Sequence, residues 1–331
     1  MTKLLFSAQK DEGPFLLEWI LYHRLIGFDD IVMYSNDCTD SSYELLDILA
    51  SYGLLTHYRT SPSLDESAQG HAADLMFKSH HYQKADWVSW VDADEFICVN
   101  CDGHNVDALI DNLGNAFGVF MNWRLFGDNK ISAWRDGSVL EQFDSCARKG
   151  NRANNPVKAF FRPHHTIEEL YIHRPVLSDG FPKEGLDVLG SDGECIPMKM
   201  VMGKRPHGPP LQVHQTNKRK YSLVQVNHYA VRTFDVFSLK KFRGSGMKAI
   251  GASEELRGRR HGDQFWVKRN RNEVKDHSIQ IHLPKLKQEI AYWLSKPDVR
   301  EAHYSCCHNL SQRLYGLSKK GYPMNATDAG L

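Results

Sequence analysis

The chain has 331 residues, a net charge of +1 at pH 7, a hydrophobic share of 41% and a charged share of 24%. This length can bury a sizeable core, and the composition excludes the disordered, collagen-like and coiled-coil classes of protein. The sequence has no apolar run of the roughly 18–20 residues that a membrane span needs, and its start turns polar too soon for a signal peptide. Seven scattered cysteines, an odd number, do not resemble a disulfide framework. We therefore expect a soluble, cytoplasmic protein with free thiols.

The first hundred residues alternate strand and helix signals. Short apolar runs at 3–8, 31–34, 54–58 and 87–91 predict four strands. Helices are predicted between them, from about Phe15 to Ile26, after a capping box at Ser41–Glu44, and over residues 66–84. This order predicts an α/β fold with a mostly parallel sheet and helices on both faces. Ligands of such sheets bind beyond the carboxyl ends of the strands, so the polar residues there are the first site candidates.

The pattern is looser after residue 120. Residues 123–220 are rich in Gly, Pro, His and Asn, which predicts short strands and long loops, and helical signals return at 234–242 and 283–294. We expect one half over residues 1–120, a looser half over 121–317 and a flexible tail over 318–331.

Positive charge is concentrated in a basic segment of the second half. Between Lys218 and Lys275 the sequence has 15 Lys/Arg and 5 Asp/Glu, so the rest of the chain is acidic. A basic segment suits phosphate groups and an acidic remainder suits metal ions, and solvated helix faces are the alternative interpretation.

The strongest chemical signal is Asp92-Ala93-Asp94-Glu95, which we call the acidic motif, directly after the apolar run 87–91. In an extended segment Asp92 and Asp94 point to the same side and can share one ion. Oxygen ligands favour Mg²⁺ or Mn²⁺ over zinc. Without a cation the carboxylates repel one another, so Asp94→Asn should leave the fold intact or slightly stabilised. The alternative is a helix N-terminus capped by acidic side chains.

Several segments together resemble the glycosyltransferase family 2-like proteins, including the subgroup with Asp-Glu-Phe after the strand. These segments are Lys10–Gly13, Glu18–Asp29, Ser35–Asp40 and the acidic motif with Phe96, followed by the shorter Trp123–Gly127 and Asn227–Tyr229. The resemblance implies a GT-A fold, in which a Rossmann-like sheet binds a nucleotide-sugar and an Asp-x-Asp motif holds a cation on the donor diphosphate. Residues 1–120 would then bind the donor, and residues 121–317 would face the acceptor.

The resemblance also assigns roles to single residues. Asp94 would be the main ligand of a Mn²⁺ or Mg²⁺ ion, and Asp92 a second ligand that contacts the ribose or sugar. It places four more residues at the nucleotide, namely Lys10, Glu12, Asn36 and Asp40. Many relatives have Asp where this sequence has Asn36, so UDP-linked and GDP-linked donors both stay open. Turn and cap chemistry is the alternative for Ser35–Asp40.

His228 is the candidate for a third metal ligand. It lies in an alternating stretch that predicts a strand, and the resemblance implies that a histidine of the later half completes the metal shell. Imidazole suits Mn²⁺ better than Mg²⁺. A hydrogen-bonded core histidine is the alternative. Downstream, Lys240, Lys241 and Arg243 would offset the charge of the diphosphate.

These features predict a metal-dependent glycosyltransferase of bacterial glycan synthesis that moves a sugar to a hydroxyl of a glycan or other acceptor. The resemblance implies inversion, which needs a carboxylate base, and the candidates are Glu141, Asp144, Asp192 and Glu194. Trp123 could stack on a sugar ring or belong to the core. We expect no nucleic-acid partner and no transmembrane segment, and peripheral contact with a membrane stays open.

Two other functions fit parts of the sequence. A phosphatase or phosphotransferase of the Asp-x-Asp type would use Asp92 as nucleophile and Asp94 as acid/base, but its motif follows the first strand and not the fourth. A non-catalytic protein that binds polyanions through the basic segment would bind with a steep salt dependence. That function leaves the acidic motif unexplained.

Overall fold

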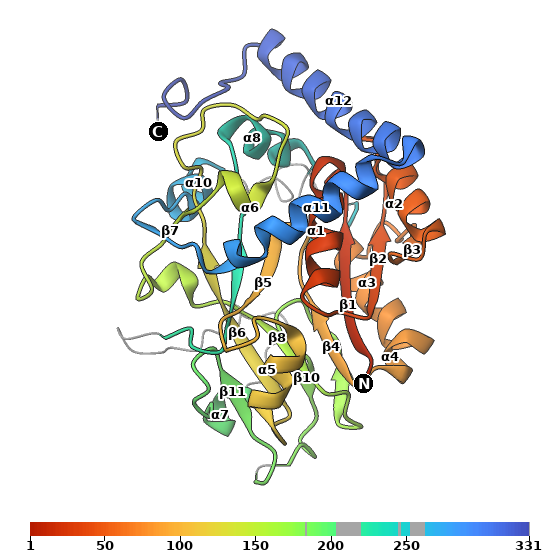
Figure 1. Ribbon diagram of the computed structural model, residues 1–331, viewed down its shortest axis with the longest axis vertical. Coiled ribbons are helices and arrows are strands. Elements are labelled where there is room, and N and C mark those ends of the chain that lie inside the picture. Colours follow the sequence, from red (N-terminus) through yellow and green to blue (C-terminus); the bar gives the residue numbers. More distant parts are fainter. Residues whose placement is uncertain (183, 203–219, 244–245, 252–261, 331) are drawn as a thin grey trace.

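Figure 1 shows the computed structural model of the chain, which describes residues 1–182, 184–202, 220–243, 246–251 and 262–330. Several parts of the predicted basic segment lie outside the described residues, at 218–219, 244–245 and 252–261. The side chains of Lys241 and Arg243, which we expected near a diphosphate, are also outside them.

Within the described residues, a nine-stranded sheet forms the centre of the fold. Its strands lie in the order β3 (Thr56–Arg59), β2 (Asp30–Ser35), β1 (Lys3–Gln9), β4 (Trp87–Trp90), β8 (Val157–Phe161), β6 (Gly118–Leu125), β12 (Val224–His228) and β5 (Glu95–Val99), and β11 (Val188–Gly190) also pairs with β6. The first four strands are parallel, β8 is antiparallel to both neighbours, and β12 is parallel to β6. The strands β1 to β4, β6 and β12 therefore all run the same way, and their carboxyl ends meet at one edge.

Helices cover both faces of this sheet because side chains alternate along its strands. Leu5 and Met33 enter one apolar cluster, whereas Leu4 and Val32 enter a second. The first cluster includes side chains of α1 (Gly13–Leu25), α2 (Ser42–Ser51), α5 (Val106–Leu113), α11 (Leu283–Leu294) and α12 (Pro297–Lys319), and the second includes those of α3 (Ala68–Phe77) and α4 (His80–Lys84). The order β3-β2-β1-β4 is that of a Rossmann-like half. The predicted α/β class, with a mostly parallel sheet and helices on both faces, is confirmed.

Most predicted elements of the first half are present, with two corrections. The helix predicted over 66–84 is two helices, because the Ser79 hydroxyl accepts a hydrogen bond from Tyr82 N (3.2 Å) and starts α4. The capping box predicted at Ser41–Glu44 is wrong, since the Ser41 side chain makes no cap hydrogen bond. Asp40 serves instead, accepting a hydrogen bond from Ser42 N at 3.0 Å.

In the described residues of the second half, α8, α11 and α12 are the longer helices and most other elements are short. The helical signals at 234–242 and 283–294 correspond to α8 (Phe234–Arg243) and α11. The short elements are α6 (Val139–Gln142), α7 (Met198–Val201), α10 (Asp263–Arg269), β7 (Ser145–Cys146), β9 (Ile167–Glu169), β10 (Val176–Leu177), β13 (Val274–Lys275) and 3₁₀ turns at Arg152–Asn154 and Ser278–His282. The long helix α12, which we did not predict, follows α11.

The two predicted halves share one sheet, because β8 and β12 pair with strands that begin before residue 120. Residues 320–330 follow α12, and Met324, Ala326 and Ala329 pack against the body, so the flexibility of this tail stays a prediction. All seven cysteines are free thiols, as predicted. No helix in the described part of the chain combines the length and the apolarity needed to span a membrane.

Candidate functional site

An open cavity of about 180 Å³ lies at the edge where the carboxyl ends of the parallel strands meet. Loops that follow β1, β2 and β4 line it, together with the ends of β6 and β12. We call it the edge cavity. It brings together most of the residues proposed from the sequence, namely Lys10, Glu12, Asn36, Asp92, Asp94, Trp123, His228 and Lys240. Parallel strands that share an edge place these distant segments side by side.

The acidic motif forms a tight turn between β4 and β5. Glu95 N donates a hydrogen bond to Asp92 O (2.9 Å), and Asp92 N donates one to Glu95 Oε2 (2.8 Å). The predicted extended conformation is therefore wrong, and so is the alternative of a helix N-terminus, because strand β5 follows the turn. Asp92 and Asp94 nevertheless both line the edge cavity, whereas the side chain of Glu95 is fully buried.

Basic side chains surround Asp94. Its Oδ2 accepts a hydrogen bond from Lys240 Nζ at 2.7 Å, and its Oδ1 lies 3.5 Å from His228 Nε2. Burial alone would raise the pKa of Asp94, but the charges of Lys240 and Arg232, together with the polar contact of the His228 imidazole, hold this pKa well below its usual range. Asp94 is therefore a carboxylate at neutral pH, which is the protonation state that a metal ligand needs.

His228 ends β12 and lies on the wall of the edge cavity. Strand pairing places it beside Glu95 of β5, and its ring packs edge-on against Trp123 with ring centroids 4.3 Å apart. Burial lowers the pKa of His228, although the nearby Asp94 carboxylate opposes this effect. The imidazole is therefore neutral at pH 7, the form that binds metal ions.

Two side chains at the acidic motif were not predicted from the sequence. Lys158 of β8 is fully buried, and its Nζ lies 3.0 Å from Glu95 Oε2 and 3.4 Å from Asp92 Oδ2. Gln69 of α3 donates a hydrogen bond to Asp92 Oδ1 at 3.1 Å. Burial raises the pKa of Glu95 to about 8, opposed by Lys158 and assisted by the charges of Asp92 and Asp94. The buried Glu95 thus has a pKa near neutrality.

Glu12 is a buried member of the site. Its Oε2 accepts a hydrogen bond from Arg232 Nη1 at 2.7 Å, and Arg232 Nη2 donates to Ala93 O at 3.3 Å. Through these two hydrogen bonds, Arg232 links the loop after β1 to the turn of the acidic motif. Lys10 lies at the same edge of the sheet, with its Nζ 3.8 Å from Asp37 Oδ2. The predicted contact of Lys10 and Glu12 with a nucleotide stays a prediction.

Asp40 does not line the edge cavity. It is buried, and its carboxylate accepts hydrogen bonds from Gly13 N (2.8 Å) and Ser42 N (3.0 Å), which is the cap chemistry that we gave as the alternative. It lines a neighbouring cavity of about 410 Å³ instead. Lys10, Glu12 and Lys240 border both cavities, so the two are adjacent.

The four candidate bases line neither cavity. Glu141 is exposed and pairs with Lys287 at 2.7 Å, and Asp192 and Glu194 lie in a turn after β11. Burial alone would raise the pKa of Asp144, but hydrogen bonds from Lys275, Asn129 and His277 lower it to about 2. A carboxylate with so low a pKa is a weak base. The structure therefore does not bring these residues to the acidic motif.

The fold and the edge cavity define an α/β protein with a candidate ligand site that carries carboxylates, a neutral imidazole and lysines. The chain belongs to glycosyltransferase family 92, whose family model matches residues 12–180. The family 2-like assignment and its Asp-Glu-Phe subgroup are not confirmed by this match. A glycosyltransferase family 92 protein of Arabidopsis thaliana, At1g27200, is 31% identical over 88 residues, which are 26% of this chain and 14% of that protein. The match thus spans a small part of that relative's length.

Solved structures with detectable similarity include those of TarS and LgtC. The structure of S. aureus TarS 1-349 has a TM-score of 0.33 at 9% identity, covering 97% of this chain and 92% of that one. The galactosyltransferase LgtC, solved with donor and acceptor sugar analogues, has a TM-score of 0.31 at 12% identity, covering 68% of this chain and 86% of that one. Similarity at this level carries no argument about the activity of this chain.

Proposed function

We propose that this protein is a metal-dependent glycosyltransferase that moves a sugar from a nucleotide-sugar to an acceptor hydroxyl. The observation that carries the proposal is the convergence of Asp92, Asp94, His228 and Lys240 on the edge cavity. Membership of glycosyltransferase family 92 supports the type of reaction. UDP or GDP as the nucleotide, inversion, a bacterial glycan product and a cytoplasmic location are further predictions.

The edge cavity carries donor types that suit a divalent cation, although the ligand atoms of Asp92, Asp94 and His228 do not all lie within 4.8 Å of one another in the structure. Asp92 and Asp94 offer carboxylate oxygens, and His228 offers a neutral nitrogen, a donor set that suits Mn²⁺ and is less natural for Mg²⁺. Such an ion, when bound, stabilises the negative charge that develops on a leaving diphosphate.

The partner of Lys240 would change when a cation and a nucleotide-sugar bind. Its ammonium balances the charge of Asp94 at 2.7 Å and is also held by Ala230 O at 3.0 Å. A cation at Asp94 would take over that balance. Because the contact with Ala230 keeps Lys240 at the cavity wall, its charge then becomes available to phosphate oxygens of the donor. Lys10, which borders the same cavity, would add to this attraction.

A thermal-shift experiment tests the proposal. The full chain is heated with UDP, GDP and their sugar conjugates, with and without Mn²⁺. A ligand at 100 times its dissociation constant stabilises the native state by about 2.7 kcal/mol, so binding should be measurable as a higher melting temperature. We expect a shift that needs Mn²⁺ and disappears in Asp94→Asn. Asp298→Asn removes an exposed carboxylate on α12 that lines neither cavity, and should behave like the wild type.

Three results would contradict the proposal and separate it from the alternatives. A nucleotide shift that is equal without Mn²⁺ and in Asp94→Asn would exclude the metal role of Asp94. Hydrolysis of p-nitrophenyl phosphate that depends on Mg²⁺ and Asp92 would favour the phosphatase. Binding of polyphosphate with a steep salt dependence, together with no response to any nucleotide, would favour the polyanion-binding protein.

A further inference from the structure

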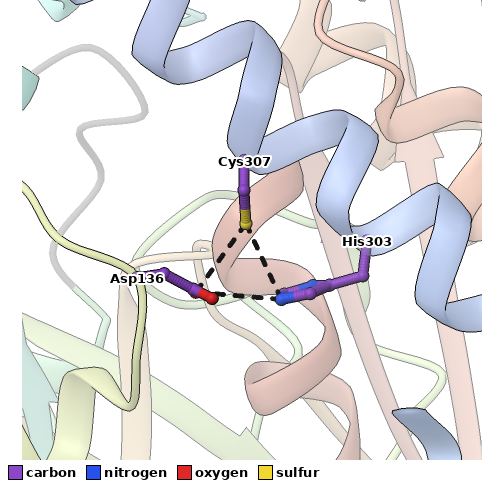
Figure 2. A group of neighbouring side chains, drawn as sticks. All are labelled: Asp136, His303 and Cys307. Atoms are coloured by element: carbon purple, nitrogen blue, oxygen red, sulfur yellow. Dashed lines mark hydrogen bonds and ion pairs between the residues drawn. The ribbon is translucent and has the colours of Figure 1, made fainter. Parts of the chain in front are cut away.

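A second cluster of metal-binding side chains lies between α12 and the loop that precedes α6 (Figure 2). His303 and Cys307 are four positions apart on α12, so they project from the same side of the helix. Asp136 faces them from the loop, as Figure 2 shows. None of the three lines the edge cavity or its neighbour.

The three ligand atoms form a nearly regular triangle. Cys307 Sγ lies 3.7 Å from His303 Nε2 and 3.7 Å from Asp136 Oδ1, and His303 Nε2 lies 3.9 Å from Asp136 Oδ1. Tetrahedral zinc, with bonds of about 2.3 Å to sulfur and about 2.0–2.2 Å to nitrogen and oxygen, holds such atoms roughly 3.3–3.7 Å apart. Shifts of a few tenths of an ångström in side-chain position would therefore suffice to bind the ion.

The same geometry does not fit a thiol–imidazole–carboxylate catalytic triad. In a triad the imidazole contacts the nucleophile with one ring nitrogen and the acid with the other. Here Nε2 of His303 faces both Cys307 and Asp136. Nδ1 of His303 makes no hydrogen bond to any residue that the structure describes. Three donors that point at one position are the arrangement of metal ligands.

The donor set and its burial indicate which ion fits. A thiolate and an imidazole favour zinc over Mg²⁺, Ca²⁺ or Mn²⁺, which prefer oxygen. His303 and Cys307 are both 7% exposed, whereas the side chain of Asp136 is 46% exposed. An ion would thus be shielded by the helix and reached from solvent beside Asp136, where water could supply the fourth ligand.

We propose that Asp136, His303 and Cys307 form a zinc site that fastens α12 to the loop before α6. The loop is joined to other parts of the fold on both sides of Asp136, because Trp134 N donates to Asp235 Oδ2 of α8 (2.8 Å) and Val139 N donates to Glu18 Oε2 of α1 (2.7 Å). The zinc ion therefore links α12 to the loop between these two anchors. This site is independent of the proposed glycosyltransferase activity.

Zinc binding includes a proton balance. Burial raises the pKa of the Cys307 thiol to about 12, and the charge of Asp136 adds to this effect, so without metal the sulfur carries its proton. Binding forms a zinc–thiolate bond and breaks the S–H bond, and the proton leaves to solvent. Zinc affinity should accordingly fall as the pH is lowered.

Cobalt substitution tests the site on the full chain. Metal-free protein is titrated with Co²⁺ and followed by absorption, because a thiolate ligand gives a sulfur-to-cobalt charge-transfer band that oxygen and nitrogen ligands do not give. We expect this band to saturate at one Co²⁺ per chain and to disappear when Zn²⁺ is added. Cys307→Ser should lose the band. Cys195→Ser, which removes an exposed thiol elsewhere, and Asp94→Asn, which alters the edge cavity, should both retain it.

Asp136→Asn provides a second test that leaves the helix untouched, since its side chain is nearly half exposed. Its zinc affinity, measured by calorimetry, should fall at least about tenfold. This is the lower end of the loss of affinity that follows when a metal site is disturbed. Circular dichroism of each variant shows whether it is folded. The proposal is wrong if wild-type protein gives no charge-transfer band, if the band persists in Cys307→Ser, or if Asp136→Asn binds zinc as tightly as the wild type.

Discussion

Asp94 shows how the partners of a side chain change the expected effect of its replacement. The sequence places it among three acids, so repulsion predicted that Asp94→Asn would be neutral or stabilising. In the structure Lys240 lies 2.7 Å away, and Lys158 lies near both Asp92 and Glu95. Lys158 belongs to β8 and Lys240 to α8, and both elements lie far along the chain from the acidic motif. The positive charges of Lys240 and Lys158 therefore outweigh the repulsion among the three acids.

We predict that Asp94→Asn lowers the free energy of unfolding of the metal-free protein by about 1–3 kcal/mol, because Lys240 loses its charged partner in a largely buried position. Urea denaturation in the presence of a chelator measures the change. Glu141→Gln is the matched control, since Glu141 and Lys287 are also 2.7 Å apart but both are more than half exposed. An exposed pair of this kind contributes about 0–1 kcal/mol. Equal effects of the two substitutions would show that burial does not strengthen the Asp94 pair.

Glu95 should make stability depend on pH. Its folded-state pKa of about 8 lies above the ordinary value of 4.5, so the folded state holds a proton that the unfolded state releases. The stability that this proton provides is complete below about pH 4.5, declines as the pH rises, and is lost above about pH 8. Glu95→Gln does not titrate, so its stability relative to the wild type should increase with pH, by at most about 1.4 kcal/mol per pH unit.

Urea unfolding of both proteins at pH 5.5 and pH 7.5, with a chelator present, measures this difference. A constant difference between the two pH values would mean that Glu95 is already ionised in the folded protein at pH 5.5. The chelator is needed because a cation at Asp92 and Asp94 would itself favour the ionised form of Glu95.

Secondary-structure elements differ in how far local sequence determines them. The strands at 3–8 and 31–34 and the helix at 283–294 were predicted because apolar spacing is a local signal. The insertion of antiparallel β8 between β4 and β6 depends on pairing between distant segments, so Lys158 could not be placed at the acidic motif. Helix α12 does carry a helical apolar stripe, but alanine and cysteine occupy part of it and weaken the signal.

Strand β12 determines the position of the third predicted metal ligand. Its pairing with β5 and β6 fixes the register that places His228 beside Glu95 and 3.5 Å from Asp94. The alternating pattern around His228 predicted the strand. The neighbours of the strand, and hence the distance to Asp94, could not be predicted because they follow from the strand order of the whole sheet.

We predict that His228→Ala weakens Mn²⁺ binding in the presence of nucleotide by about tenfold or more, as expected for a lost coordinating contact. Calorimetry measures the affinity. His173→Ala is a suitable control, because His173 is also buried and lines the same cavity, with its Nδ1 within hydrogen-bonding distance of Val157 O. If both variants bind Mn²⁺ like the wild type, His228 is not a ligand. If both lose affinity equally, the effect arises from the cavity wall in general.

At the scale of the whole molecule, helix α12 covers helices of the N-terminal half. Helix α12 packs against α1, α2, α8 and α11, as Figure 1 shows for its course along the upper side of the molecule. Pro14 and Phe15 of α1 line the cavity next to the edge cavity, and α8 carries Lys240, which borders both. The halves divided at residue 120 in the sequence are therefore joined in space by the shared sheet and by this helix.

We predict that removal of residues 297–331 prevents cooperative folding of the rest of the chain. Four large apolar side chains of α12 are at most 8% exposed, namely Val299, Leu310, Leu314 and Leu317. Each contributes about 1.5–3 kcal/mol by burial, and together they approach the whole stability of an ordinary domain, about 5–15 kcal/mol. Their loss also uncovers the apolar sides of α1 and α2.

Removal of residues 320–331 alone should lower the free energy of unfolding much less, because the apolar residues there are only partly buried. Urea unfolding followed by near-ultraviolet circular dichroism compares the two truncations with the full chain, and a cooperative transition of the shorter chain near the full-length midpoint would show that the sheet is stable without α12.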